Sequence, residues 1–132
     1  MQMRWGDANA VLYIVDADAS VRNALCRLAI AAGFEARPFD SIDHFIASLS
    51  PHGKGCVILD SSLLSDAARL RVAMHESGVD WPVIVLCADH NSAARHDARL
   101  IGARFLLNKP VDGQALIDAV AWVTEADADV AH

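Results

Sequence analysis

Hydrophobic residues in this 132-residue chain alternate between short continuous runs and helical spacing. Five runs have the length and apolar content of strands, and they cover residues 11–15, 34–39, 56–59, 82–87 and 103–107. Between these runs, apolar residues recur at intervals of three and four, which is the period of one helix face. The pattern therefore predicts five strands that alternate with five helices.

Each predicted helix rests on one apolar stripe and on signals at its ends. Ser41 is placed to cap the second helix, and Gly33, Gly78 and Gly102 stand where helices are expected to stop. The five stripes are Val21, Leu25, Leu28 and Ala32; Ile42, Phe45, Ile46 and Leu49; Leu63, Ala67, Leu70 and Met74; Ala94, Ala98 and Ile101; and Leu116, Val120 and Val123.

The strand sequences indicate how the sheet is built. The runs at 56–59 and 82–87 are apolar on both faces, which is typical of a parallel sheet covered by helices on both sides. The run at 34–39 is more polar and contains Pro38, so it is expected at a sheet edge. We predict an α/β fold: a three-layer, doubly wound, flavodoxin-like (βα)5 domain with parallel strand order 2-1-3-4-5.

Composition limits the domain organisation and the function. Hydrophobic residues make up 54% of the chain, enough for one buried core, and residues 10–123 are predicted to form the domain, with loose segments at 1–9 and 124–132. The net charge is −6 and no Lys/Arg-rich run is present, so nucleic-acid binding is not expected. With neither a span of roughly 20 apolar residues nor a signal-peptide core, we expect no membrane contact and a cytoplasmic location.

Three polar residues stand at the ends of predicted strands. Asp16 follows the first strand, Asp60 the third, and Lys109 the fifth. Ligands of open α/β sheets bind beyond the carboxyl ends of the strands, where strand order reverses, and the first and third strands flank that point. Each Asp alone is explained as a helix or turn cap. Together, two carboxylates provide ligands for Mg²⁺, a carboxylate is able to attack phosphorus, and an ammonium pairs with phosphoryl oxygens.

Over about residues 10–123 the chain resembles the receiver domain of two-component response regulators. Asp16 matches the first acid of that family's acidic pair, and Asp60 matches the aspartate that accepts phosphate from a histidine kinase. Lys109-Pro110 matches its Lys-Pro pair, which has a cis peptide bond. The resemblance implies a phosphorelay signalling module and not an enzyme. Its implied Mg²⁺ ligands are Asp16, Asp60 and the backbone carbonyl of Ser62, and its implied upstream partner is a histidine kinase or phosphotransfer protein.

The chain departs from the family at specific positions. The second acid of the pair is Ala17, so we expect Mg²⁺ to bind weakly at best. The segment SSLLSDAA after Asp60 has neither the usual Met-Pro pair nor the Gly. Cys87 stands at the position of the switch Ser or Thr, and Leu106 at that of the switch aromatic. Phe105 is one position away and is expected to face the other side of the sheet.

Two of these positions have alternative interpretations. Asp18 is either a replacement metal ligand or, as we favour, a residue at the helix N-terminus. Cys87 near the pocket is either a redox-active thiol or, as we favour, a packed and inert side chain, because a reactive thiol needs exposure as well as a lowered pKa.

Three functional hypotheses follow. The first is a single-domain response regulator with Asp60 as phosphoacceptor, an impaired Mg²⁺ site and an output through protein–protein interaction, without an attached DNA-binding domain. The second is a pseudo-receiver that dimerises or binds a partner without phosphate. In either case we expect the downstream partner or a second copy on the Ala94–Leu107 face, which carries Arg95, Arg99 and Arg104. The third, a flavin or cobalamin binder, is disfavoured. The DADAS loop lacks the Gly- and hydroxyl-rich phosphate cradle that a flavin site needs, and no Asp-x-His-x-x-Gly stretch suits cobalamin.

Overall fold

The computed structural model describes residues 10–50, 53–88 and 92–130. Strands and helices alternate through this part of the chain, as the hydrophobic pattern predicted. In chain order the elements are β1 (Val11–Val15), α2 (Ala19–Ala31), β2 (Glu35–Phe39), α3 (Ile42–Ala47), β3 (Gly55–Asp60), the 3₁₀ helix η1 (Ser61–Asp66), α4 (Ala67–Glu76), β4 (Val83–Cys87), α5 (Ser92–Leu100), β5 (Phe105–Asn108) and α6 (Gly113–Val130).

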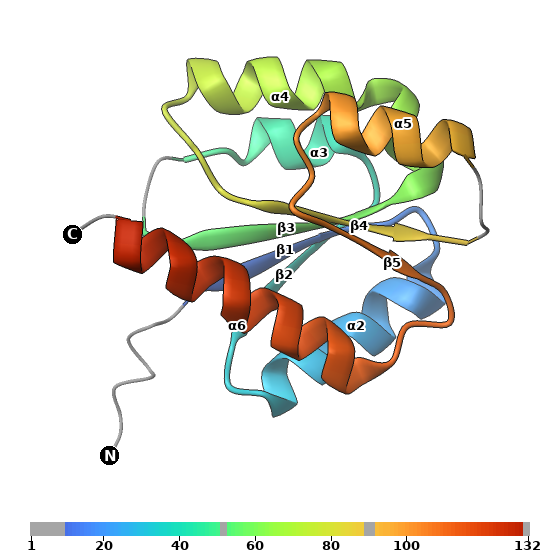
Figure 1. The fold of residues 1–132 in the computed structure, drawn as a ribbon, viewed down its shortest axis with the longest axis vertical. Coiled ribbons are helices and arrows are strands. Elements are labelled where there is room, and N and C mark those ends of the chain that lie inside the picture. Colours follow the sequence, from blue (N-terminus) through green and yellow to red (C-terminus); the bar gives the residue numbers. More distant parts are fainter. Residues whose placement is uncertain (1–9, 51–52, 89–91, 131–132) are drawn as a thin grey trace.

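The strands form one parallel sheet in the order β2-β1-β3-β4-β5, which confirms the predicted fold class. Helices α2 and α6 cover one face of the sheet, and α3, α4 and α5 cover the other (Figure 1). Strand β2, which contains Pro38, lies at an edge as expected, because proline cannot donate to a second neighbour. No helix among the described residues is long and apolar enough to cross a membrane.

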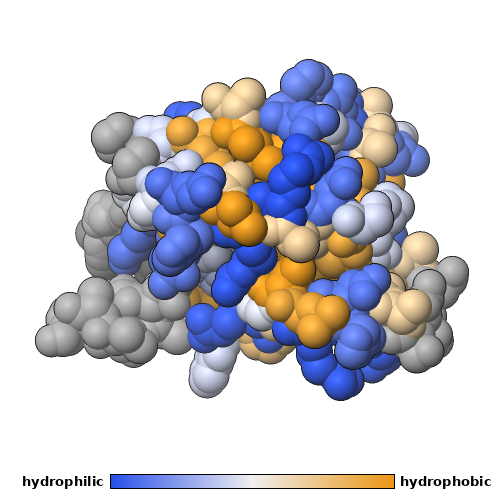
Figure 2. Space-filling model, turned by 90° about the horizontal axis from the view of Figure 1, so that it is seen from above, coloured by the Kyte–Doolittle hydropathy of each residue, from blue (hydrophilic) through white to orange (hydrophobic). Residues whose placement is uncertain are grey.

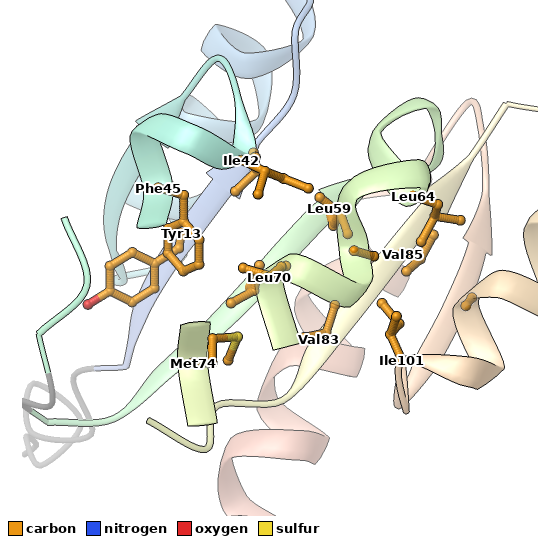
Figure 3. Close-up of a cluster of buried hydrophobic side chains, with 14 of the residues drawn as sticks. Tyr13, Ile42, Phe45, Leu59, Leu64, Leu70, Met74, Val83, Val85 and Ile101 are labelled. Carbon is orange, nitrogen blue, oxygen red and sulfur yellow. The ribbon is translucent and has the colours of Figure 1, made fainter. Parts of the chain in front are cut away.

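The three central strands are buried on both faces, and their side chains alternate between two hydrophobic cores. Val57, Leu59 and Val85 pack with the α3, α4 and α5 side chains in one core, part of which is drawn in Figure 3. Ile58 and Ile84 face the α2 and α6 side chains in the other core. This period-2 alternation explains why β3 and β4 read as continuous apolar runs.

The predicted helix signals are present. The Ser41 hydroxyl oxygen accepts a hydrogen bond from the His44 backbone N–H at 3.1 Å, as an N-cap does. Gly33, Gly78 and Gly102 end helices with φ values of 93°, 73° and 74°, a left-handed conformation that favours glycine.

Two helix predictions need correction. The stripe that begins at Leu63 does not form one α-helix: residues 61–66 form the 3₁₀ helix η1, which runs directly into α4. Three serines in this segment have weak α-helix propensity, and their hydroxyls compete for backbone groups. The last helix continues through Val130, so residues 124–130 are helical where a loose tail was expected. The expected loose segment at 1–9 lies outside the described residues.

Candidate functional site

The strand ends bring together the three residues predicted to form the pocket. Asp60 is the last residue of β3, and Asp16 directly follows β1, which pairs with β3 in register Val15↔Leu59. Lys109 follows β5, and its backbone N–H donates to the carbonyl oxygen of Cys87 at 2.8 Å. This hydrogen bond fixes the start of the β5–α6 connection at the end of β4. The lysine side chain is thereby held beside the two carboxylates.

Lys109 joins the two carboxylates. Its Nζ donates to Oδ1 of Asp60 at 2.5 Å and to Oδ2 of Asp16 at 3.4 Å. Asp16 is 3% exposed and Asp60 8% exposed, and they are the buried charged residues of the described chain. Buried carboxylates need a compensating charge or hydrogen bonds, and Lys109 provides both. The Lys109-Pro110 peptide bond is cis, as the resemblance implied.

The pKa values of Asp60 and Lys109 are shifted by their burial and by each other's charge and hydrogen bonds. Burial by itself raises the pKa of Asp60, but the hydrogen bonds from Lys109 and Ser62 outweigh burial and lower it below its usual range. Burial lowers the pKa of Lys109, and the hydrogen bond and charge of Asp60, with the charge of Asp16, raise it overall. Both groups are therefore charged at neutral pH.

Ser62 has a role that sequence reasoning missed. Its backbone N–H donates to Oδ2 of Asp60 at 3.1 Å, and its side-chain hydroxyl donates to the same oxygen in a short hydrogen bond. Asp60 is thereby the N-cap of η1 as well as a pocket residue. The available signal was the Asp-x-Ser spacing, in which an Asp side chain binds the backbone two residues on. The resemblance had assigned only the carbonyl oxygen of Ser62.

The loop after β1 provides no third carboxylate. Asp18 is the N-cap of α2: its side chain accepts from the backbone N–H groups of Ser20 and Val21, which is the interpretation we favoured. Arg22, which sequence reasoning also missed, donates to the carbonyl oxygens of Asp16 at 2.8 Å and Ala17 at 3.2 Å. No cluster of three or more His, Cys, Asp or Glu side chains suited to a metal occurs among the described residues.

Cys87 and Leu106 lie on the same face of the sheet, toward α3, α4 and α5, and Phe105 faces the opposite side, as expected. Cys87 is 1% exposed and packs in the hydrophobic core. It therefore lacks the exposure that a reactive thiol requires, which favours the interpretation as a packed side chain.

Among curated proteins, the chain is similar to one named as a transcriptional regulatory protein and one named as a nodulation protein. No protein-family model matches the chain. It is 34% identical over 116 residues to the transcriptional regulatory protein TdiR of Thauera aromatica. It is 29% identical over 119 residues to nodulation protein W of Bradyrhizobium diazoefficiens. These alignments cover 87% and 89% of this chain but 51% and 52% of those proteins, so the chain spans about half the length of the curated relatives it matches.

Solved receiver proteins match over nearly their whole length. A response regulator receiver protein from Burkholderia phymatum superposes with a TM-score of 0.74 at 30% identity, covering 89% of this chain and 96% of the other. One from Pseudoalteromonas atlantica has a TM-score of 0.75 at 20% identity, covering 89% and 98%, and supports the fold.

A doubly wound α/β fold with two buried carboxylates and a lysine at its strand ends is the arrangement that the resemblance to phosphorelay receiver domains implied. Together with the Burkholderia match, it shows that the chain belongs to the response regulator receiver domains of two-component systems. Such domains are generally signalling modules rather than enzymes, and they generally bind Mg²⁺ at the acidic pocket. The oxygen donors of Asp16 and Asp60 suit this hard cation, although two carboxylates form a small donor set.

Proposed function

We propose that this receiver accepts a phosphoryl group on Asp60, slowly and with a weakened Mg²⁺ site, and that its output is contact with another protein. The observation that carries the proposal is the ammonium of Lys109 between the carboxylates of Asp60 and Asp16. An ammonium at this point is placed to pair with the oxygens of an incoming phosphoryl group. A histidine kinase or phosphotransfer protein would supply that group.

In the proposed step, a carboxylate oxygen of Asp60 attacks phosphorus and forms a new P–O bond. The bond from phosphorus to the donor's leaving group breaks, and the leaving group keeps the electron pair and takes up a proton. The lowered pKa of Asp60 keeps this carboxylate ionised and therefore nucleophilic. Mg²⁺, held by Asp16, Asp60 and the Ser62 carbonyl, would supply charge neutralisation for the transferred group.

Two features make the step slow. Ala17 offers no carboxylate where the family has a direct metal ligand, and Asp18 is engaged as a helix cap. Both oxygens of Asp60 are already hydrogen-bonded, Oδ1 to Lys109 and Oδ2 to Ser62. An attacking oxygen must give up one of these interactions, which adds to the barrier.

Intact-mass spectrometry tests the proposal. The protein is incubated with MgCl₂ and acetyl phosphate, and samples are taken over time. We expect a partial adduct with the mass of one phosphoryl group, absent in Asp60→Asn. Ala17→Asp should reach a higher occupancy sooner, and Ala17→Asn serves as its uncharged control. Rapid, complete modification of the natural chain would contradict the impaired site.

The alternative is a pseudo-receiver that acts as a dimerisation or partner-binding module without phosphate. It is supported by the hydrogen bonds of Asp60, whose two oxygens already accept from Lys109 and Ser62. No adduct in the natural chain, together with a clear adduct in Ala17→Asp, would favour this alternative. If neither the natural chain nor Ala17→Asp forms an adduct, the missing carboxylate at Ala17 is not the sole cause of the lost phosphorylation.

The proposed output surface is the face formed by residues 94–107 of α5 and β5. Arg95, Arg99 and Arg104 are exposed around a surface hollow of about 200 Å³ that Leu106 also lines. Figure 2 shows hydrophobic and hydrophilic side chains intermixed over the side of the molecule that includes α3, α4 and α5. Light scattering at increasing protein concentration, with Arg99→Glu as the variant, tests whether a second copy binds there. If the protein stays monomeric at all concentrations, a second copy is excluded and the proposed partner is a different protein.

A further inference from the structure

We propose that Ser62 supplies the hydroxyl that responds to phosphorylation of Asp60, and that η1 carries this response to α5. The proposal rests on the proposed function in that Asp60 accepts the phosphoryl group. It differs from the family's arrangement, in which the responding hydroxyl ends β4. In this chain that position is Cys87, and a thiol is a weaker hydrogen-bond donor than a hydroxyl.

The first step of the argument is that Asp60 holds η1 in place. Oδ2 of Asp60 accepts both the backbone N–H and the hydroxyl of Ser62, and it is the side-chain cap of the 3₁₀ helix that follows. Hydrogen bonds to a carboxylate are stronger than those to a neutral oxygen, since the acceptor carries charge. The conformation of η1 is therefore linked to the charge of the proposed phosphoacceptor.

The second step is what phosphorylation does to that cap. An acyl phosphate has lost the carboxylate charge on both oxygens: one forms the bridge to phosphorus, and the other is a neutral carbonyl. Whichever oxygen is modified, the Ser62 hydroxyl loses its charged acceptor. The phosphoryl group brings strong acceptor oxygens beside it. The hydroxyl is expected to turn toward one of them, which weakens the cap of η1.

The third step is the connection from η1 to the rest of the molecule. Helix η1 contacts β3, β4, α4 and α5, and it continues into α4 without a loop. Leu64 of η1 is buried in the same core as Val85 of β4 and Ala94 of α5, and Figure 3 shows Leu64 beside Val85. A shift of η1 displaces a packed side chain, and dense packing transmits such a displacement to neighbours. Helix α5 carries the proposed output surface, so the signal reaches it through η1.

Amide NMR spectra of the ¹⁵N-labelled protein, recorded with MgCl₂ and acetyl phosphate, test the proposal. Ser62→Ala is compared with Ser62→Thr, which keeps the hydroxyl, and with Ser65→Ala, which removes an exposed hydroxyl from the same helix. Phosphorylation should shift amide signals of η1 and α5 in the natural chain and in both control variants, Ser62→Thr and Ser65→Ala. In Ser62→Ala the adduct should still form, as mass confirms, but the α5 shifts should be lost. Loss of the α5 shifts in Cys87→Ala and their retention in Ser62→Ala would overturn the proposal.

Hydrogen exchange without a phosphodonor tests the cap separately. Asp60→Ala, which removes the capping side chain, should speed amide exchange in η1 about fivefold relative to Ser65→Ala. Ser62→Ala, which loses the hydroxyl but keeps the backbone N–H, should speed it by a smaller factor. The two substitutions combined should add little beyond Asp60→Ala alone, because Asp60→Ala already removes the acceptor of the Ser62 hydroxyl. Equal exchange in Ser62→Ala and Ser65→Ala would refute the proposed link even if phosphorylation occurs. If no variant takes up phosphate but the exchange result holds, the proposed function fails and the link between Asp60 and η1 stands.

Discussion

The ammonium of Lys109 lies 2.5 Å from Oδ1 of Asp60, although 49 residues separate them in the sequence. The two residues stand at the ends of β5 and β3, with β4 between these strands. The same ammonium also reaches Asp16, so one positive charge serves two buried carboxylates. The pocket thus keeps a net charge of one negative unit, which is available to attract a cation.

Removing the ammonium should destabilise the fold. In Lys109→Met, two buried carboxylates lose their shared counter-ion, and we expect the free energy of unfolding to fall by about 2 kcal/mol. This is less than for a fully buried pair because the Lys109 side chain is about a quarter exposed. Urea denaturation measures the change. Lys54→Met, which removes an exposed lysine, is the matched control and should change little.

Adding Asp60→Asn to Lys109→Met should recover part of the lost stability, since the substitution removes one of the uncompensated charges. A double variant that is as unstable as the sum of the two single variants would show that the ion pair is not the cause.

The same pair predicts how stability depends on pH. The pKa of Asp60 is lowered from its ordinary 3.8, so its contribution is present above pH 3.8 and is lost as the pH falls through the lowered value. The pKa of Lys109 is raised from 10.5, so its contribution is present below pH 10.5 and is lost as the pH rises through the raised value. The stability difference between the natural chain and Asp60→Asn should therefore be constant across the neutral range and shrink below pH 3.8. Urea denaturation at several pH values checks this; a change between pH 5 and 9 would point to another group.

Ala17→Asp should strengthen Mg²⁺ binding. A third carboxylate beside Asp16 and Asp60 adds a direct oxygen ligand, and we expect at least about tenfold tighter binding. Isothermal titration calorimetry is the suitable measurement. The fluorescence of Trp81 would report poorly on the metal, because Trp81 precedes β4 and so lies at the opposite end of the sheet from the pocket. Ala17→Asn is the control with similar size and no charge. If Ala17→Asp and Ala17→Asn bind Mg²⁺ with equal affinity, the missing negative charge at this position is not what weakens Mg²⁺ binding.

The pocket trio was predictable from sequence because it depends on topology. Parallel strands bring their carboxyl ends to one edge, so three polar residues at three strand ends were expected to meet. The hydrogen bonds of Ser62 and Arg22 were not predicted, because they depend on how a side chain turns within a local loop. Several rotamers are open to such residues from sequence alone.

The length of α6 was underestimated for a different reason. Hydrophobic periodicity reports only the part of a helix that packs against the core, and the segment EADADV has no periodic apolar stripe. Its alanines and glutamate are good helix formers, so propensity allowed the helix to continue where burial gave no signal. The 3₁₀ helix η1 was missed because its Leu63 and Leu64 satisfy an α-helical stripe equally well.

Gly55 should be intolerant of a side chain. An added Cβ would lie 2.7 Å from the Trp81 ring and 2.8 Å from the Tyr13 ring, and these two rings stack with centroids 4.4 Å apart. Relieving the overlap must move packed aromatic rings, so we expect Gly55→Ala to lose about 1–3 kcal/mol of stability. In Gly113→Ala, at the start of α6, the nearest atoms to the added Cβ belong to the flexible end of Leu28, at 3.0 Å and beyond, so this substitution should be nearly neutral. Far-UV circular dichroism in urea compares them, and equal stabilities would contradict the tight packing.

The three cysteines should differ in their reaction with iodoacetamide. Cys56 and Cys87 are buried, whereas Cys26 on α2 is partly exposed, so Cys26 should be alkylated first in the native protein. Burial raises the pKa of the Cys26 thiol, and the nearby charge of Arg22 only partly offsets this. Its thiolate fraction at neutral pH is therefore below that of an ordinary thiol, and alkylation should be slow and should speed up as the pH rises toward its pKa. Peptide mapping after brief labelling identifies the modified residue, and urea should expose all three thiols.

Early modification of Cys87 in the folded protein would contradict this prediction and support the redox hypothesis, because it would require an opening at the end of β4 beside Lys109.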